Sequence, residues 1–170
     1  MATGPERRRR FLTPVGLLIF TGLLLLVVYG SLFTDRALDL PRLSPGAAGS
    51  VIGVLLLAVG LPLWVWCILV FSRARGTPVP FNPPRELVVV GPYACVRNPM
   101  LTGVFACLFG LGFILHSLSM VLVWTPAFLV MNVIAIKLVE EPELDLRFGA
   151  TYRDYKRGVP MFVPRAARPW

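Results

Sequence analysis

The chain has 170 residues, of which 56% are hydrophobic, with a mean hydropathy of +0.71 and a formal net charge of +8 at pH 7. Soluble globular domains use roughly 45–50% apolar residues, so this composition excludes an ordinary water-soluble fold and predicts an integral membrane protein. The basic excess does not indicate nucleic-acid binding, because the basic residues flank hydrophobic segments and do not form a soluble basic face.

Residues 14–33 and 47–71 are each apolar enough to form a membrane-spanning helix, since about 20 apolar residues cross a hydrocarbon core of about 30 Å. The four arginines at 7–10 resemble the charged region of a signal peptide. The apolar run that follows is longer than a signal peptide needs, however, and it lacks a clear cleavage site. We therefore expect a basic tail (1–13) and then a helical pair (14–71).

A connector follows at 72–98. Its proline-dense stretch RGTPVPFNPP (75–84) cannot form an ordinary helix. The run LVVV (87–90) is too apolar to stay solvated, and it ends in the turn signal Gly91-Pro92-Tyr93. We therefore expect the connector to be ordered and packed against the protein.

In the next segment, 99–139, the apolar stretch 101–139 is too long for one crossing, and its only polar break is LHSLS at 115–119. It predicts a helical hairpin with helices near 101–115 and 118–139. The first of these is short for a full crossing, which indicates tilt or local thinning of the bilayer.

Small residues line one face of the first hairpin helix, where Gly103, Ala106 and Gly110 recur at helical spacing. Such a face is typical of close helix packing, and close approach of a ligand to bare backbone is the alternative. His116, the only histidine, falls in the turn at the opposite end from the charged residues. We interpret it as a turn residue and not as a general base.

The last segment, 140–170, is polar. Leu144, Phe148, Tyr152 and Tyr155 recur in it at helical spacing, with charged residues between them. This pattern predicts an amphipathic helix that lies at the membrane interface or caps the bundle.

Glu140, Glu141 and Glu143 close the fourth expected span, where carboxylates are costly unless they are paired or solvated. One interpretation is an interfacial charge cluster in which Lys137 and Glu141 pair at i,i+4. The other is that a carboxylate binds a polar or cationic ligand, such as a cofactor with hydroxyls and a positive centre. The residues alone leave both interpretations open.

The distribution of basic residues predicts the topology. If the chain crosses four times with its N-terminus inside, 15 of the 17 Lys and Arg residues lie inside and only Arg36 and Arg42 lie outside. The expected fold is therefore a single all-α membrane domain of about four transmembrane helices, with both termini cytoplasmic. Cys67, Cys95 and Cys107 have the spacing of neither a disulfide framework nor a metal site.

Two motifs flank the expected hairpin: GPYACVRNPMLTG at 91–103 and EEPELDLRFGATYRDY at 140–155. Together they resemble the isoprenylcysteine carboxyl methyltransferase and phospholipid methyltransferase superfamily. Its members carry G-x-Y-x-x-x-R-[HN]-P-x-Y-x-G ahead of a helical hairpin and E-E-x-x-L-x-x-x-F-G-x-x-Y-x-x-Y after it. The resemblance covers residues 75–164, and the first two spans match only in hydrophobicity.

The resemblance implies a membrane enzyme that transfers a methyl group from S-adenosylmethionine to a lipophilic acceptor entering from the bilayer. An isoprenylcysteine-like carboxylate and a lipid amine are both consistent with it, and no catalytic metal is implied. The cofactor of such enzymes lies between the hairpin and the cytoplasmic connector. An ordered connector and a covering interfacial helix fit that arrangement.

The resemblance also implies roles for individual residues. Glu140 would bind the polar part of the cofactor, with Glu141 as the second candidate. Independently of the resemblance, Glu141 is the expected base if the acceptor is an amine, because an amine must first lose a proton. Carried over by position, the adenine end would be lined by Leu87 and Val88, and the ribose or amino-acid portion would be held by Tyr93, Asn98, Pro99, Met100 and Leu101.

The chain departs from the family pattern at three positions. Asn98 replaces the commoner His, as in the phospholipid branch, Leu101 stands where Tyr is usual, and Met161 stands where many relatives have Arg. The missing tyrosine hydroxyl removes one hydrogen bond, worth about 1 kcal/mol.

Two other functions stay open from the sequence. One is a sterol-type membrane reductase, which shares a similar C-terminal hairpin and uses NADPH. The other is a non-enzymatic four-helix membrane protein. A transport role would require ionisable residues facing a pathway within the spans, and the spans carry almost none.

Overall fold

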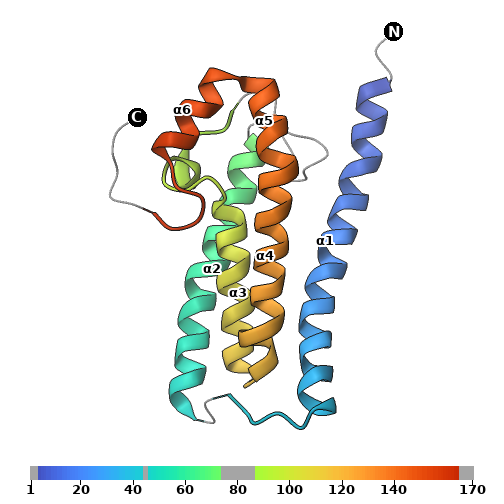
Figure 1. The fold of residues 1–170 in the computed structure, drawn as a ribbon, viewed down its shortest axis with the longest axis vertical. Helices are drawn as coiled ribbons and strands as arrows, with labels where there is room; N and C mark the ends of the chain where they lie inside the picture. The colour runs from blue at the N-terminus through green and yellow to red at the C-terminus, as the bar shows by residue number, and fades with distance from the viewer. Residues whose placement is uncertain (1–3, 44–45, 74–86, 165–170) are drawn as a thin grey trace.

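The computed structural model describes residues 4–43, 46–73 and 87–164 of the chain. Within these ranges every regular element is helical (Figure 1), so the expected all-α class is confirmed. The elements in chain order are α1 (Gly4–Ala37), α2 (Ala47–Arg73), the 3₁₀ helix η1 (Gly91–Ala94), α3 (Pro99–Ile114), the π segment η2 (Met120–Trp124), α4 (Thr125–Ala135), the π segment η3 (Ile136–Glu140), α5 (Glu141–Phe148) and α6 (Ala150–Gly158).

Three helical stretches are long and apolar enough to cross a membrane: Pro14–Ala37, Ala47–Val70 and Met120–Phe148. The apolar α3 is shorter, at 16 residues. Large apolar side chains cover the outward faces, and Leu18 of α1 is 71% exposed. Soluble proteins rarely expose contiguous apolar surface on this scale. The molecule is therefore a membrane protein with three full-length apolar helices and one shorter one.

Helices α2 and α3 run antiparallel and approach closely because glycines face each other at two levels. A Cβ atom placed on Gly60 would lie 2.7 Å from the carbonyl oxygen of Gly103, and one on Gly53 would lie 2.6 Å from that of Gly110. No side chain fits in such a gap, so the two backbones touch directly. The prediction that the small-residue face of α3 packs against another helix is confirmed.

The predicted polar break at 115–119 is the turn of the hairpin. His116 has a φ of 53° there, and its Nδ1 lies 3.0 Å from the carbonyl oxygen of Leu43. It is a turn residue, as predicted. The second helix of the hairpin does not end near residue 139, however. It continues through η3 and α5 to Phe148.

Two π-helical segments interrupt this long helix, and each ends two residues before a proline. The segment η2 precedes Pro126 and η3 precedes Pro142, and in η3 the N–H of Glu141 donates to the carbonyl of Ile136, five residues earlier. A proline ring clashes with the carbonyl four residues before it, and a wider π turn relieves that clash by inserting one residue. The inserted residue rotates the helix that follows, so the direction of Glu141 differs from that expected for an unbroken α-helix.

Hydrogen bonds fasten α1 to the hairpin turn. The Asp35 carboxylate accepts from the Ser117 hydroxyl and from the Ser119 N–H, the latter at 2.9 Å. The Ser119 hydroxyl donates to the carbonyl of Ser31 at 2.8 Å, and the Trp124 indole N–H donates to Thr34 at 3.1 Å. We call this set the turn-end latch: Ser31, Thr34, Asp35, Ser117, Ser119 and Trp124.

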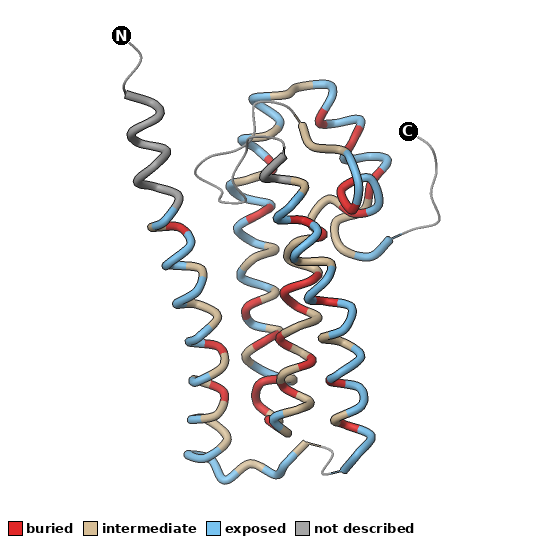
Figure 2. The backbone as a smooth tube through the Cα atoms, turned by 180° about the vertical axis from the view of Figure 1, so that it is seen from behind, coloured by how far each residue is buried: buried red, intermediate tan, exposed pale blue. Residues whose placement is uncertain are grey.

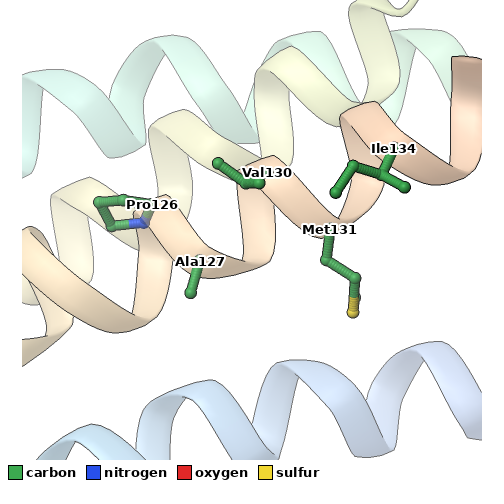
Figure 3. A pocket seen from close by; sticks show the side chains of 5 residues that line it. All are labelled: Pro126, Ala127, Val130, Met131 and Ile134. Atoms are coloured by element: carbon green, nitrogen blue, oxygen red, sulfur yellow. The ribbon is translucent and has the colours of Figure 1, made fainter.

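Away from the turn-end latch, α1 diverges from α4 (Figures 1 and 2). An apolar groove of about 480 Å³ lies on α4 (Figure 3). It is lined by Pro126, Ala127, Val130, Met131 and Ile134. Because every lining side chain is apolar, lipid chains can fill this groove without losing hydrogen bonds.

The C-terminal segment forms a cap at the end opposite the turn, which we call the cap end. The sequence predicts one amphipathic helix here, but the chain breaks at Gly149, whose φ of 55° favours glycine, and α6 begins after it. Leu87 and Val89 pack against the buried Tyr152 and Tyr155 of α6. The described end of the connector is therefore packed, as predicted, and residues 74–86 lie outside the described residues.

Candidate functional site

Segments from distant parts of the sequence meet at the cap end: η1, the start of α3, the start of α5, and α6 (Figure 1). Gly91 opens η1 with a φ of 61°, and a Cβ placed on it would lie 3.6 Å from the Trp66 ring of α2. Glycine therefore suits both the backbone conformation and the close approach to α2. This turn carries Tyr93 into a buried position beside α2.

The chain after α6 returns along the start of α3. The N–H of Arg97 donates to the carbonyl of Pro160 at 2.8 Å, and the N–H of Asn98 donates to that of Met161 at 3.0 Å. Phe162 then packs edge-on against Phe105 of α3, with the ring centroids 5.7 Å apart. We call residues 160–162 the strap. It fixes the main chain between η1 and α3.

Glu141 lies at the centre of the cap end, and both of its carboxylate oxygens accept hydrogen bonds from cations. Oε1 is 2.5 Å from Arg97 Nη1, and Oε2 is 2.5 Å from Lys156 Nζ. The side chains of Glu141 and Arg97 are 10% and 12% exposed, and that of Lys156 is 45% exposed. A buried ion pair needs such complete pairing to offset its desolvation. We call Arg97, Glu141 and Lys156 the Glu141 triad.

The alternative pairing of Glu141 with Lys137 is wrong. Lys137 is exposed, and both Glu141 oxygens face other elements. The physical reason is the π segment, because the spacing of four residues brings side chains together only in a regular α-helix.

Glu140 precedes Glu141 but faces elsewhere, since neighbouring residues on a helix point about 100° apart. Its side chain is half-buried, and within the described ranges it makes no hydrogen bond or ion pair. Glu143, by contrast, is exposed. Of these three carboxylates, Glu140 is the one that is partly buried and unpaired among the described residues, so its oxygens can accept hydrogen bonds from a ligand.

A buried tyrosine pair joins α6 to η1. The Tyr155 hydroxyl donates to the carbonyl of Tyr93 at 2.6 Å. Burial is the main cause that raises the pKa of Tyr93, with the neighbouring Cys67 adding to it. Burial also raises the pKa of Tyr155. Both phenols therefore stay neutral near pH 7, which keeps Tyr155 a hydrogen-bond donor.

Several residues that the family resemblance implies for the cofactor lie together at this end. Asn98 occupies the N-cap position of α3, where its side chain makes no capping hydrogen bond. The backbone carbonyl of Asn98 accepts a hydrogen bond from the Thr102 hydroxyl at 3.0 Å. The buried Pro99 begins the helix, and Tyr93 lies beneath α6.

The other implied residues are spread more widely. Leu87 packs against the tyrosines of α6, and Leu101 packs against the apolar core that includes Phe105. Val88 and Met100 are half-buried. The roles of these residues toward a cofactor stay predictions.

Three residues that join the segments of this site were not predicted from the sequence: Arg97, Tyr155 as a hydrogen-bond donor, and Lys156. A signal for Arg97 was present, because an arginine next to the start of an apolar helix requires a carboxylate partner. The partner lies 44 positions away, and local spacing does not reveal such a contact.

The chain is thus a small helical membrane protein with a polar site at its cap end. The model of the family described as "Phospholipid methyltransferase" matches residues 48–151, more than half of the chain. The chain belongs to the phospholipid methyltransferase family, a family of membrane methyltransferases. The resemblance inferred from the two motifs is confirmed, but the match also includes α2, so the expectation that the second span matches only in hydrophobicity is wrong.

The chain is also similar to a curated protein, the "Nickel-cobalt-cadmium resistance protein NccN" of Alcaligenes xylosoxydans xylosoxydans. The two are 31% identical over 115 residues, which cover 68% of this chain and 48% of that protein. The chain thus spans about half the length of the curated relative it matches. In the part of the chain that the structure describes, no group of three or more His, Cys, Asp or Glu could hold a metal ion.

Proposed function

We propose that this protein is an S-adenosylmethionine-dependent methyltransferase that acts on a lipophilic acceptor reached from the bilayer. The observation that carries the proposal is the contact between Arg97 and Glu141, which brings the two family motifs together across 44 positions of sequence. The motifs thus form one polar site at the end of an otherwise apolar bundle.

The donors and acceptors at this site suit an adenosyl amino-acid cofactor. The buried Arg97 Nε has no hydrogen-bond partner among the described residues, and Glu140 is a half-buried carboxylate. An arginine N–H can bind a carboxylate, and a carboxylate can bind hydroxyls or an amine. We assign Glu140 to the polar part of the cofactor, Asn98 and Tyr93 to its ribose or amino-acid portion, and Leu87 and Val88 to its adenine.

The bound cofactor would supply an activated methyl group on a sulfonium centre. The residues of the chain then have to align the acceptor with that group and exclude water from it. Tyr93, Tyr155 and Val96 are buried at the cap end and can help to exclude water. An acceptor that arrives as a carboxylate needs no base, whereas an amine must first lose a proton.

We also propose that the cap end faces the cytoplasm. The N-terminal end of α1 lies at the same end of the bundle as α5 and α6 (Figure 1), and the basic residues of the sequence concentrate there. A cysteine introduced beside Arg42 should react with an impermeant reagent added outside, and one beside Arg157 should not. Labelling beside Arg157 from outside would contradict this orientation.

The experiment for the proposed function is calorimetric titration of the detergent-purified chain with S-adenosylmethionine, S-adenosylhomocysteine and NADPH. Selective binding of the adenosyl compounds is expected. Selective binding of NADPH would favour the reductase alternative, and binding of none of the three would favour a non-enzymatic membrane protein.

A further inference from the structure

We propose that Glu141 is a positioning residue, which acts through Arg97 and Lys156 to hold α6 and the strap closed over the cofactor site. The Lys156–Glu141 pair is one of the contacts that open when cofactor exchanges. This inference rests on the proposed methyltransferase function, and it reassigns Glu141 from the general-base role expected for an amine acceptor.

The contacts of Glu141 argue against a role in proton transfer. Each of its two oxygens accepts a charge-assisted hydrogen bond at 2.5 Å, and the bond from the buried Arg97 is of the kind that is about twice as strong as a neutral one. If Glu141 took a proton from an acceptor, it would lose its charge and weaken both pairs. A general base at this position would weaken its own two ion pairs in every turnover. A carboxylate that holds two segments together is instead stabilised by both bonds.

The Arg97 side of the triad is the fixed side. Arg97 is 12% exposed, and its backbone N–H also donates to the strap at Pro160. It lies between Tyr93 of η1 and Asn98 at the start of α3. A carboxylate that fixes Arg97 therefore fixes the strap and the two neighbouring residues assigned to the cofactor.

The Lys156 side of the triad is the side that can open. Lys156 is 45% exposed, and ion pairs with an exposed partner are weak and are screened by salt. The chain also has a candidate pivot for α6, because Gly149 adopts a φ of 55° and no described atom lies within 4 Å of the position its Cβ would take. Rotation about Gly149 would lift α6 without a clash at that residue.

The test compares variants of the full-length chain in lipid nanodiscs: Glu141→Gln, Lys156→Gln and Lys156→Arg. The matched control is Arg157→Gln, which removes an exposed cation that pairs with Asp154 of the same helix. Two quantities are measured. They are the dissociation rate of radiolabelled S-adenosylhomocysteine and, in ligand-free protein, the hydrogen–deuterium exchange of residues 150–158.

Glu141→Gln should accelerate S-adenosylhomocysteine dissociation about tenfold, and Lys156→Gln about threefold because its pair is partly exposed. Both should increase the exchange of residues 150–158. Lys156→Arg should restore both quantities to within about twofold of wild type, because arginine keeps the charge. Arg157→Gln should change neither.

Unchanged dissociation and exchange in Lys156→Gln, which alters a half-exposed side chain and leaves the core intact, would overturn the proposal. So would a Glu141→Gln protein that binds and releases S-adenosylhomocysteine as wild type does but fails to transfer methyl groups, since that result restores a base. If wild type binds no S-adenosylhomocysteine, the proposed function fails, and the exchange of the ligand-free variants still decides whether Glu141 holds α6.

Discussion

The two ends of the bundle are each tied by one carboxylate, but the partners of that carboxylate differ. Asp35 at the turn end accepts from neutral groups, the Ser117 hydroxyl and the Ser119 N–H. Glu141 at the cap end accepts from two cations on separate segments, and one of them, Lys156, is half-exposed. Bonds from neutral groups on one rigid turn are insensitive to salt, whereas an exposed ion pair is screened. The comparison indicates a permanent attachment at the turn end and a reversible one at the cap end.

Asp35→Ala should break the permanent attachment and give the largest effect. It removes the acceptor of two hydrogen bonds and leaves the Ser119 N–H unpaired, which costs about 3 kcal/mol of unfolding free energy. Chemical unfolding in detergent measures this change. Arg36→Ala, one residue further along α1 and exposed, is the control and should be nearly neutral. S-adenosylhomocysteine binding by the folded Asp35→Ala protein should match wild type, and a loss of binding would show that the two ends are coupled.

Glu140→Gln should weaken cofactor binding at the cap end and leave the attachment of α1 at the turn end unchanged. A charge-assisted hydrogen bond in a partly desolvated site contributes on the order of 1.5–3 kcal/mol, so the affinity for S-adenosylmethionine should fall by more than tenfold. Glu143→Gln, three residues away on an exposed side chain, should have little effect. Calorimetric titration measures both, and equal, negligible losses would leave Glu140 with a structural role only.

Tyr155→Phe should have the smallest effect on the free energy of unfolding, about 1 kcal/mol for one hydrogen bond. It should also remove the part of the pH dependence of stability that comes from this phenol. Burial raises the pKa of Tyr155 in the folded protein, whereas in the unfolded chain the phenol has a pKa near the usual value of about 10. The contribution of this tyrosine is therefore complete below pH 10 and falls as the pH rises above it.

The measurement is the decrease in the midpoint temperature of thermal unfolding when the pH is raised from about 8 to about 10.5, on either side of the usual phenol pKa. The decrease should be larger for wild type than for Tyr155→Phe. An identical decrease in both proteins would assign the pH dependence to other groups.

The sequence predicted features that depend on composition and length. The apolar stretches were identified because a bilayer demands about 20 apolar residues per span. The turn at 115–119 was identified because three polar residues, His116, Ser117 and Ser119, cluster there within an apolar run. The small face of α3 was interpreted correctly because Gly103 and Gly110 have few uses in a membrane helix besides close packing.

Features that depend on contacts between distant residues were not predicted. Asp35 and Ser117 are 82 positions apart and Arg97 and Glu141 are 44 apart, so no local pattern pairs them. The π segment before Pro142 shifted the register of the helix and invalidated the i,i+4 argument for Lys137. The break at Gly149, in contrast, could have been found, because a glycine after a helical run is a common C-terminal signal.

The central claim is that the cap end transfers methyl groups to a lipophilic acceptor, and the most direct test is a transfer assay. Wild type, Asp35→Ala and Glu140→Gln are placed in lipid vesicles with methyl-labelled S-adenosylmethionine, and the label that enters the organic extract is counted. We predict labelled product from wild type and from folded Asp35→Ala, and a loss of more than tenfold for Glu140→Gln at subsaturating cofactor. Equal labelling by wild type and Glu140→Gln, or no adenosyl binding and no labelling by wild type, would contradict the claim.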